Sequence, residues 1–255
     1  MNQNNISSKL IAVVPTYNER QNIGLLVRTF FNILPSASLL VVDDNSPDKT
    51  VEEVADLKKE FPRLNFLLRH SERGLGKSYI DALKKLAGDN RYEIIVMMDA
   101  DFSHDPRMIP GMLERLSQYK IVIGSRYVRG GGVANWNMRR KMLSRFANFY
   151  ARFILGLSIK DMTAGFFVFD RSVLSTLDLN SIKSEGYAFL IELKYRFSRL
   201  GYEIYEYPVI VSDRTQGQSK ISKKVIWESI WLPWKLKLRK IQNSSSIKPC
   251  TKNQD

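Results

Sequence analysis

Two carboxylates stand one residue apart directly after an apolar run. Residues Glu93 to Met98 read EIIVMM, and Asp99-Ala100-Asp101 follows them. If this run is a strand, both carboxylates lie at the rim of a sheet, where their oxygens suit a hard divalent cation such as Mg²⁺. Such a cation would offset the charge that develops on a diphosphate leaving group. An Asp pair of this kind also arises by chance or as a helix cap, but the preceding strand favours a metal site.

A second acidic motif follows another apolar run. Leu39 to Val42 is succeeded by DDNSPD, residues 43 to 48. Acidic residues at strand ends accept hydrogen bonds from ribose hydroxyls, so Asp44 is a candidate for binding a nucleobase or ribose. The end of the motif, Ser46-Pro47-Asp48, is typical of a turn that caps the next helix.

Basic residues that could hold phosphate lie in the second half. Arginine binds phosphate with two parallel hydrogen bonds, and lysine acts as a mobile point charge. Arg214 and Lys220 share the polar loop DRTQGQSK, which could close over a diphosphate. The remaining members of this set are Arg126, Arg139 and Arg140.

The segment Arg73 to Ser78 reads RGLGKS and is similar to part of a phosphate-binding P-loop. The first glycine of a true P-loop is absent, so the segment is better described as a glycine turn that opens a helix. An ATPase is therefore excluded. The two histidines, His70 and His104, are too few for a histidine metal cluster.

The order of the elements predicts an α/β fold with a mostly parallel sheet. Apolar runs are separated by helical patterns of about 10–15 residues, which is typical of parallel strands buried on both faces. Ligands of such sheets bind beyond the carboxyl ends of the strands, where the polar motifs stand, so one site is expected. The predicted strands are Leu10–Pro15, Leu39–Val42, Asn65–Leu68 and Glu93–Met98, and the helices are Glu19–Leu34, Val51–Phe61 and Gly76–Ala87.

The second half is less regular. We expect a strand at Ile121–Ile123, a basic helix over Met138–Leu155 and a strand within Thr163–Phe169. A helix over Ala188–Leu200 and an extended segment over Tyr202–Val211 follow. Residues 241 to 255 are polar and are predicted to be disordered.

Composition narrows the class of protein. The chain has 255 residues and one cysteine, Cys250, which excludes a disulfide framework and a cysteine metal site. The N-terminal residues Met1 to Lys9 are polar and contain no apolar signal core, so we expect no secretory signal. The longest uncharged stretch, Thr29 to Val42, has 14 residues, whereas a membrane span needs about 20.

The net charge of +13 is unevenly placed. Residues 1 to 105 carry 13 basic and 15 acidic residues, and residues 106 to 255 carry 26 and 11. A basic half suggests phosphate, anionic lipid or nucleic acid as a partner. Nucleic acid, which the 28 aromatic residues would also suit, is disfavoured because the acidic strand ends would repel its backbone.

Six motifs together resemble the polyprenol-phosphate (dolichol-phosphate) mannosyltransferases, which are inverting GT-A glycosyltransferases of family 2. The likeness runs from about Lys9 to Ile221, and it implies a GT-A (Rossmann-like) domain over residues 1–240 with peripheral C-terminal helices. Residues 9–127 would bind nucleotide-sugar and 128–240 the acceptor. The motifs are VVPTYNER (13–20), VVDDNSPD (41–48), RGLGKS (73–78), MDADFSHDP (98–106), GSRY (124–127) and DRTQGQSK (213–220).

The resemblance also implies roles for single residues. Asp99, Asp101 and Arg126 would be catalytic, Asp101 and Ser103 would bind the metal, and Arg126, Arg140 and Ser144 would bind the lipid phosphate. The nucleotide-sugar would contact Pro15, Tyr17, Glu19, Val42, Asp44, Asp99, Ala100, Asp101, Arg126, Arg214 and Lys220.

The expected reaction is transfer of mannose from GDP-mannose to a polyprenyl phosphate, with inversion and with Mg²⁺ or Mn²⁺. A phosphate acceptor is largely anionic at neutral pH and needs no strong base. The alternatives are UDP-glucose as donor, or a glycan hydroxyl as acceptor. The latter needs a carboxylate base, for which Asp161, Glu185 and Glu192 are candidates.

We expect the enzyme to be peripheral, on the cytoplasmic side of a membrane. The segment Lys220 to Lys240 mixes tryptophan with lysine, which is typical of a lipid–water interface. These tryptophans could equally pack on the GT-A core or on a membrane-spanning partner subunit. Pro233 should divide it into two short pieces.

Overall fold

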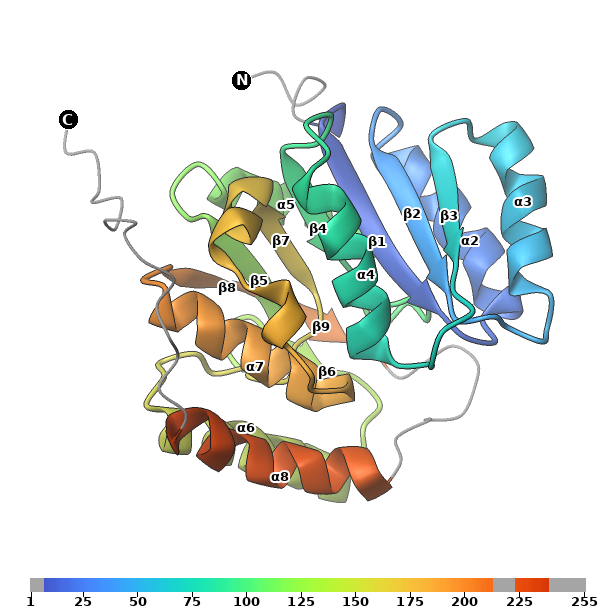
Figure 1. The fold of residues 1–255 in the computed structure, drawn as a ribbon. Coiled ribbons are helices and arrows are strands. Elements are labelled where there is room, and N and C mark those ends of the chain that lie inside the picture. The colour runs from blue at the N-terminus through green and yellow to red at the C-terminus, as the bar shows by residue number, and fades with distance from the viewer. Residues whose placement is uncertain (1–6, 213–222, 239–255) are drawn as a thin grey trace, which may run out of the picture.

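The computed structural model describes residues 7–212 and 223–238. A seven-stranded sheet forms its centre, in the order β3-β2-β1-β4-β7-β5-β8, and β6 pairs with β9 in a separate short sheet (Figure 1). The strands are β1 (Leu10–Thr16), β2 (Ser38–Asp43), β3 (Leu64–Leu68), β4 (Ile94–Met97), β5 (Ile121–Ser125), β6 (Gly132–Val133), β7 (Phe167–Asp170), β8 (Ile204–Pro208) and β9 (Ile210–Val211).

Helices cover both faces of the sheet (Figure 1). Side chains alternate along a strand, so β1 sends Ala12 and Val14 to one apolar cluster and Ile11 and Val13 to the other. The first cluster contains α2 (Arg20–Ile33), α3 (Thr50–Glu60) and α5 (Ile109–Arg115), and the second contains α4 (Leu75–Ala87) and α7 (Gly186–Arg199). Three short 3₁₀ helices complete this part: η1 (Pro106–Met108), η2 (Arg171–Thr176) and η3 (Leu179–Ser181).

The sheet is mostly parallel, as the sequence predicts. Strand β1 pairs in parallel with β2 and β4, and β5 pairs in parallel with β8. Strand β7 runs antiparallel between β4 and β5 and joins strands from the two halves of the chain. The expected α/β architecture is confirmed. The direction of β7 is not readable from the sequence, because an apolar run carries no information about its orientation.

Helix α6 (Met138–Leu155) has the predicted bounds. Asn137 caps it by accepting a hydrogen bond from the amide of Arg140 at 2.8 Å. The helix ends at Gly156, whose φ of +67° is the left-handed conformation that glycine adopts without strain. Local sequence signals therefore fix both ends.

Helix α8 (Lys223–Leu238) passes through Pro233 without a break, so the expectation of two short segments is wrong. Proline removes one helical hydrogen bond, but tertiary packing compensates. Leu232 and Leu236 are buried in the cluster that also contains α7. The helix lies beside α6 (Figure 1), and Tyr150 of α6 donates a hydrogen bond to the carbonyl of Ile230 at 2.8 Å. In the two described ranges, no helix is long and apolar enough to cross a membrane.

Candidate active site

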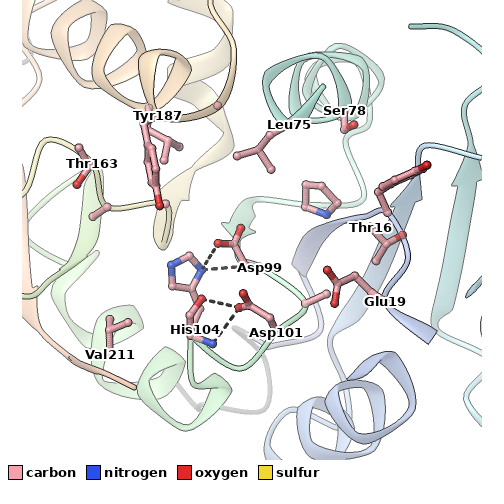
Figure 2. A pocket seen from close by; sticks show the side chains of 18 of the residues that line it. Thr16, Glu19, Leu75, Ser78, Asp99, Asp101, His104, Thr163, Tyr187 and Val211 are labelled. Carbon is pink, nitrogen blue, oxygen red and sulfur yellow. Dashed lines mark hydrogen bonds and ion pairs between the residues drawn. The ribbon is translucent and has the colours of Figure 1, made fainter. Parts of the chain in front are cut away.

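A cavity of about 700 Å³ opens at the carboxyl ends of β1 and β4, where the sequence predicts a site (Figure 2). Residues of both halves of the chain line it. Ten residues expected to bind nucleotide-sugar, metal or lipid phosphate are on its wall: Pro15, Tyr17, Glu19, Asp44, Asp99, Ala100, Asp101, Ser103, Arg126 and Arg140.

Four other expected residues are placed differently. The side chain of Val42 is fully buried in the core beside Val13 and does not line the cavity. Ser144 lies one turn beyond Arg140 on α6, off the cavity wall, and accepts a hydrogen bond from the Tyr127 hydroxyl at 2.7 Å. Because Val42 is buried, its side chain does not reach a ligand in the cavity. The predicted diphosphate residues, Arg214 and Lys220, lie outside the described residues.

The two carboxylates of the Asp99-Ala100-Asp101 motif differ in exposure. The side chain of Asp99 is 35% exposed, whereas Asp101 is buried. Ser103 donates to Asp101 Oδ1 through its amide at 3.1 Å and its hydroxyl at 2.6 Å (Figure 2). Phe102 between them has a φ of +62°, a conformation that bulky residues rarely adopt and that marks a strained turn. The turn thus fixes one oxygen of Asp101 and presents both carboxylates at the cavity.

The side chain of His104 also contacts this turn. Its Nδ1 accepts a hydrogen bond from the Asp99 amide at 2.9 Å, and its ring stacks on Phe166 with centroids 5.1 Å apart. A Cβ at Gly165 would lie 3.2 Å from His104 Cε1, so the backbone there approaches the imidazole closely. His104 therefore lines the cavity and supports the motif.

Tyr79 of α4 is fully buried near the same carboxylates. Its hydroxyl has no hydrogen-bond partner among the residues that the structure describes. Burial, with repulsion from Asp99 and Asp101, raises the pKa of this phenol well above its usual value. Tyr79 therefore stays neutral beneath the acidic motif.

Asp44 is held by the glycine turn that follows β3. Arg69 forms a buried ion pair with its Oδ1, the Ser78 hydroxyl donates to the same atom at 2.9 Å, and the Gly74 amide donates to Oδ2 at 2.9 Å. Burial opposes the Arg69 cation, but hydrogen bonds to Asp81 and Asp44 outweigh it and raise the pKa of Arg69. The RGLGKS segment thus positions Asp44 at the cavity, as part of a turn and not as a P-loop.

Arg126, on the cavity wall, forms a buried ion pair with Asp161. Its Nε and Nη2 donate to the two carboxylate oxygens at 2.8 and 2.7 Å, and Nη2 also donates to Thr163 at 2.7 Å. Burial disfavours both charges, yet the pairing outweighs it, so the pKa of Arg126 is raised and that of Asp161 is lowered. Both groups therefore remain ionised.

Two charged residues, of which Lys194 is fully buried and Glu206 half-buried, support the loop that carries Asp161. Glu206 of β8 accepts hydrogen bonds from the Asp161 amide at 2.9 Å and the Ser125 hydroxyl at 2.7 Å. Lys194 of α7 donates to the carbonyls of Ala164 at 2.5 Å and Met162 at 3.2 Å. Sequence reasoning missed both, and it missed Arg69, because single charged residues in helices and strands give no local signal of burial.

Comparison with known proteins decides the family. The model of glycosyl transferase family 2 matches residues 11–178. The chain belongs to glycosyl transferase family 2. It is therefore a glycosyltransferase, and the resemblance noted from its motifs is confirmed.

Two curated relatives align in sequence with most of the enzyme. An undecaprenyl-phosphate mannosyltransferase of Micrococcus luteus is 36% identical over 87% of this chain and 91% of its own length. A polyprenol monophosphomannose synthase of Mycolicibacterium smegmatis is 39% identical over 88% of this chain and 85% of its own.

Solved structures share the fold of the enzyme at low identity. Glucosyl-3-phosphoglycerate synthase of Mycobacterium tuberculosis, in complex with Mn²⁺, UDP and glucosyl-3-phosphoglycerate, has a TM-score of 0.65 and 18% identity, covering 90% of this chain and 79% of that chain. The same protein in complex with Mg²⁺ and UDP has a TM-score of 0.64, covering 89% of this chain and 79% of that chain. This likeness confirms the GT-A fold.

Proposed function

We propose that the enzyme transfers mannose from GDP-mannose to a polyprenyl phosphate, with inversion, through one catalytic domain of residues 1–240. The observation that carries this proposal is the identity of 36–39% to two relatives named for polyprenyl-phosphate mannose synthesis, over 85% or more of both chains. The cavity suits such a reaction, because the carboxylates of Asp99 and Asp101 and the guanidinium groups of Arg126 and Arg140 all line it.

The donor would lie along the ends of β1, β2 and β4. Pro15, Tyr17, Glu19 and Asp44 would surround base and ribose, and Asp99 to Asp101 the sugar-diphosphate. Tyr17 has the guanidinium of Arg73 4.3 Å above its ring, so this wall is rigid. For Val42 a role could come only from its backbone. Arg214 and Lys220 remain the predicted diphosphate residues.

The donor set on this wall fits a divalent cation, Mg²⁺ or Mn²⁺. Two carboxylates and a hydroxyl are the oxygen ligands that such ions take, together with substrate phosphate. Asp101, oriented by Ser103, would be the main protein ligand, and relatives of the same fold hold Mn²⁺ or Mg²⁺. A bound cation would offset the charge of the departing diphosphate.

The acceptor half favours a phosphate over a hydroxyl acceptor. A phosphate monoester has its second pKa at ~6 and is already a nucleophile at neutral pH. Two of the three candidate bases for a hydroxyl acceptor form buried ion pairs with arginine. Asp161 forms an ion pair with Arg126. Glu192 forms an ion pair with Arg196 and accepts a hydrogen bond from the Ser184 hydroxyl. Arg126 and Arg140 would instead bind the acceptor phosphate, with Ser144 behind them.

Helices α6 and α8 would bring the enzyme to a lipid surface, where it is expected to act from the cytoplasmic side. Large apolar side chains on α6 recur at helical spacing and face solvent, up to 74% exposed at Phe153, whereas surface helices normally turn such a face inward. Tryptophan and basic residues beside an apolar stripe are typical of interfacial helices. The exposed residues, hereafter the apolar face, are Met138, Met142, Leu143, Phe146, Phe149 and Phe153 of α6 and Ile230, Trp231, Trp234 and Leu238 of α8.

The proposed function is tested with a donor panel. GDP-mannose, GDP-glucose, UDP-glucose and UDP-mannose, each labelled in the sugar, are incubated with polyprenyl phosphate, and the lipid phase is counted. Label from GDP-mannose should enter the lipid, and EDTA should abolish it. The variant Asp101→Asn should fold as the wild type does and transfer nothing. Transfer only from a UDP-sugar would contradict GDP-mannose as the donor. Activity that survives EDTA would contradict the requirement for a divalent cation.

A further inference from the structure

Trp136 lies between the two arginines that the proposed function assigns to the acceptor phosphate. It stands in the loop between β6 and α6, on the cavity wall, and is only 9% exposed. The Arg140 guanidinium carbon is 3.9 Å from the centre of its indole ring, and that of Arg126 is 5.6 Å away. One aromatic ring therefore contacts both cations.

This contact has a physical consequence. Two guanidinium groups repel each other, whereas the face of an indole attracts cations, and most strongly where water is excluded. Arg126 is already fixed by Asp161, but Arg140 lies on an exposed position of α6. The contact with the indole face therefore favours the conformation of Arg140 in which its guanidinium lies on the same ring as that of Arg126.

The indole nitrogen of Trp136 belongs to a side chain that lines the cavity. Its Nε1–H is buried and has no acceptor among the described residues. Buried donors without partners are rare in native proteins, and each calls for an explanation. Arg126 uses Nε and Nη2 for Asp161 and Thr163, which leaves Nη1 as its donor toward the cavity. An oxyanion with several acceptor oxygens would suit donors from all three residues.

We propose that Trp136 is a positioning and binding residue of the acceptor-phosphate site: its ring holds Arg140 beside Arg126, and its indole N–H donates to a phosphate oxygen. The inference rests on the proposed function, since it takes the acceptor to be a polyprenyl phosphate. The ligand chemistry is that of a phosphate monoester on a lipid.

Calorimetric titration with farnesyl phosphate, a short soluble acceptor, tests this without any donor. Trp136→Leu, which loses ring and donor, should weaken binding at least about tenfold, the scale of a desolvated cation–π contact. Trp136→Phe keeps a ring but loses the donor, so it should weaken binding by about three- to tenfold, less than Trp136→Leu does. The affinity for the nucleoside diphosphate that the wild type binds should stay unchanged in both. Phe61→Leu, which removes the remote contact of Phe61 with Arg28, is the matched control and should bind farnesyl phosphate as the wild type does.

A second comparison isolates the positioning role. If the ring acts by holding Arg140, then Trp136→Leu should cost less affinity for farnesyl phosphate in the Arg140→Ala background than in the wild type, because only the indole donor is then lost. Additive losses would overturn that role. Wild-type affinity in Trp136→Leu, or equal weakening of phosphate and nucleotide binding, would overturn the whole inference and leave the proposed function intact. Failure of the wild-type enzyme to bind farnesyl phosphate would overturn both.

Discussion

His104 Nδ1 accepts a hydrogen bond from the backbone amide of Asp99 at 2.9 Å (Figure 2). Through this ring nitrogen the imidazole side chain supports the backbone of the acidic motif. The stack on Phe166 fixes the ring in the orientation that this bond requires. The backbone of the proposed metal site is thus held by a side chain five residues later.

We expect His104→Leu to lower kcat by about 10–100-fold, the cost of losing an outer support of a metal site. His104→Asn should retain more activity, because its amide oxygen can accept the same bond. Steady-state kinetics give kcat, and thermal melting shows whether both variants fold. Equal activity in the two variants would mean that the bond to Asp99 does not matter.

Tyr79→Phe should leave the free energy of unfolding unchanged or raise it by about 1 kcal/mol. The change removes a buried hydroxyl that has no partner among the described residues, and such a group costs free energy on folding. The ring stack on Phe189, with centroids 5.9 Å apart, is retained. Urea denaturation measures the effect. A loss of more than about 1 kcal/mol would reveal a hydrogen bond to this hydroxyl.

Glu185→Gln separates the phosphate acceptor from a hydroxyl acceptor. Glu185 is the candidate base that lines the cavity, with one oxygen 3.7 Å from Lys77 Nζ. A phosphate acceptor needs no base, so kcat should remain within about threefold. Loss of a true general base would cost about 10²–10⁴-fold. The measurement is kcat with saturating donor and acceptor.

The stability of the folded protein should depend on pH because of Lys194. Burial lowers the pKa of Lys194 from 10.5 to about 7, although Asp161 and Glu206 attract the cation and Arg126 opposes it. At pH values between about 7 and 10.5, Lys194 carries a proton in the unfolded chain that it has lost in the folded chain. Stability should therefore rise with pH from 7 toward 10.5, by up to about 1.4 kcal/mol per unit, and the penalty should be full below pH 7.

Lys194→Met should lose this rise. The free energy of unfolding in urea is compared at pH 7 and pH 9 for the wild type, Lys194→Met and the control Lys84→Met, which changes an exposed lysine of α4. The control should keep the wild-type slope. If Lys194→Met keeps it as well, the lysine is charged throughout this range.

The apolar face of α6 and α8 should bind anionic vesicles. Phe146 and Phe149 belong to it, and replacing both by serine should reduce co-sedimentation at least tenfold, since each buried side chain contributes about 1.5–3 kcal/mol. Leu25→Ser, a change at an exposed leucine of α2, is the matched control. If the wild type stays in the supernatant at low salt, a membrane-spanning partner covers this face instead.

Much of the fold and of the acidic cavity wall was predictable because the signals are local. The apolar runs at Leu10, Leu39 and Glu93 end in polar motifs, and parallel strands bring those ends to one edge. Asp44, Asp99 and Asp101 were therefore found from spacing alone. The bounds of α6 were found for the same reason, since its cap Asn137 and its terminal Gly156 are neighbours of the helix in sequence.

What tertiary structure decided is how distant charges are paired. Arg126 meets Asp161 across 35 residues, and Lys194 reaches carbonyls 30 and 32 residues away. No periodicity encodes such partners, because burial of a charge depends on packing of the whole chain and not on its neighbours. The same holds for α8: by sequence Pro233 should end the helix, but contacts of Leu232 and Leu236 with the core keep it continuous. Residue types determined the chemistry available to this protein, and packing decided which of those groups face the cavity, the core or the surface.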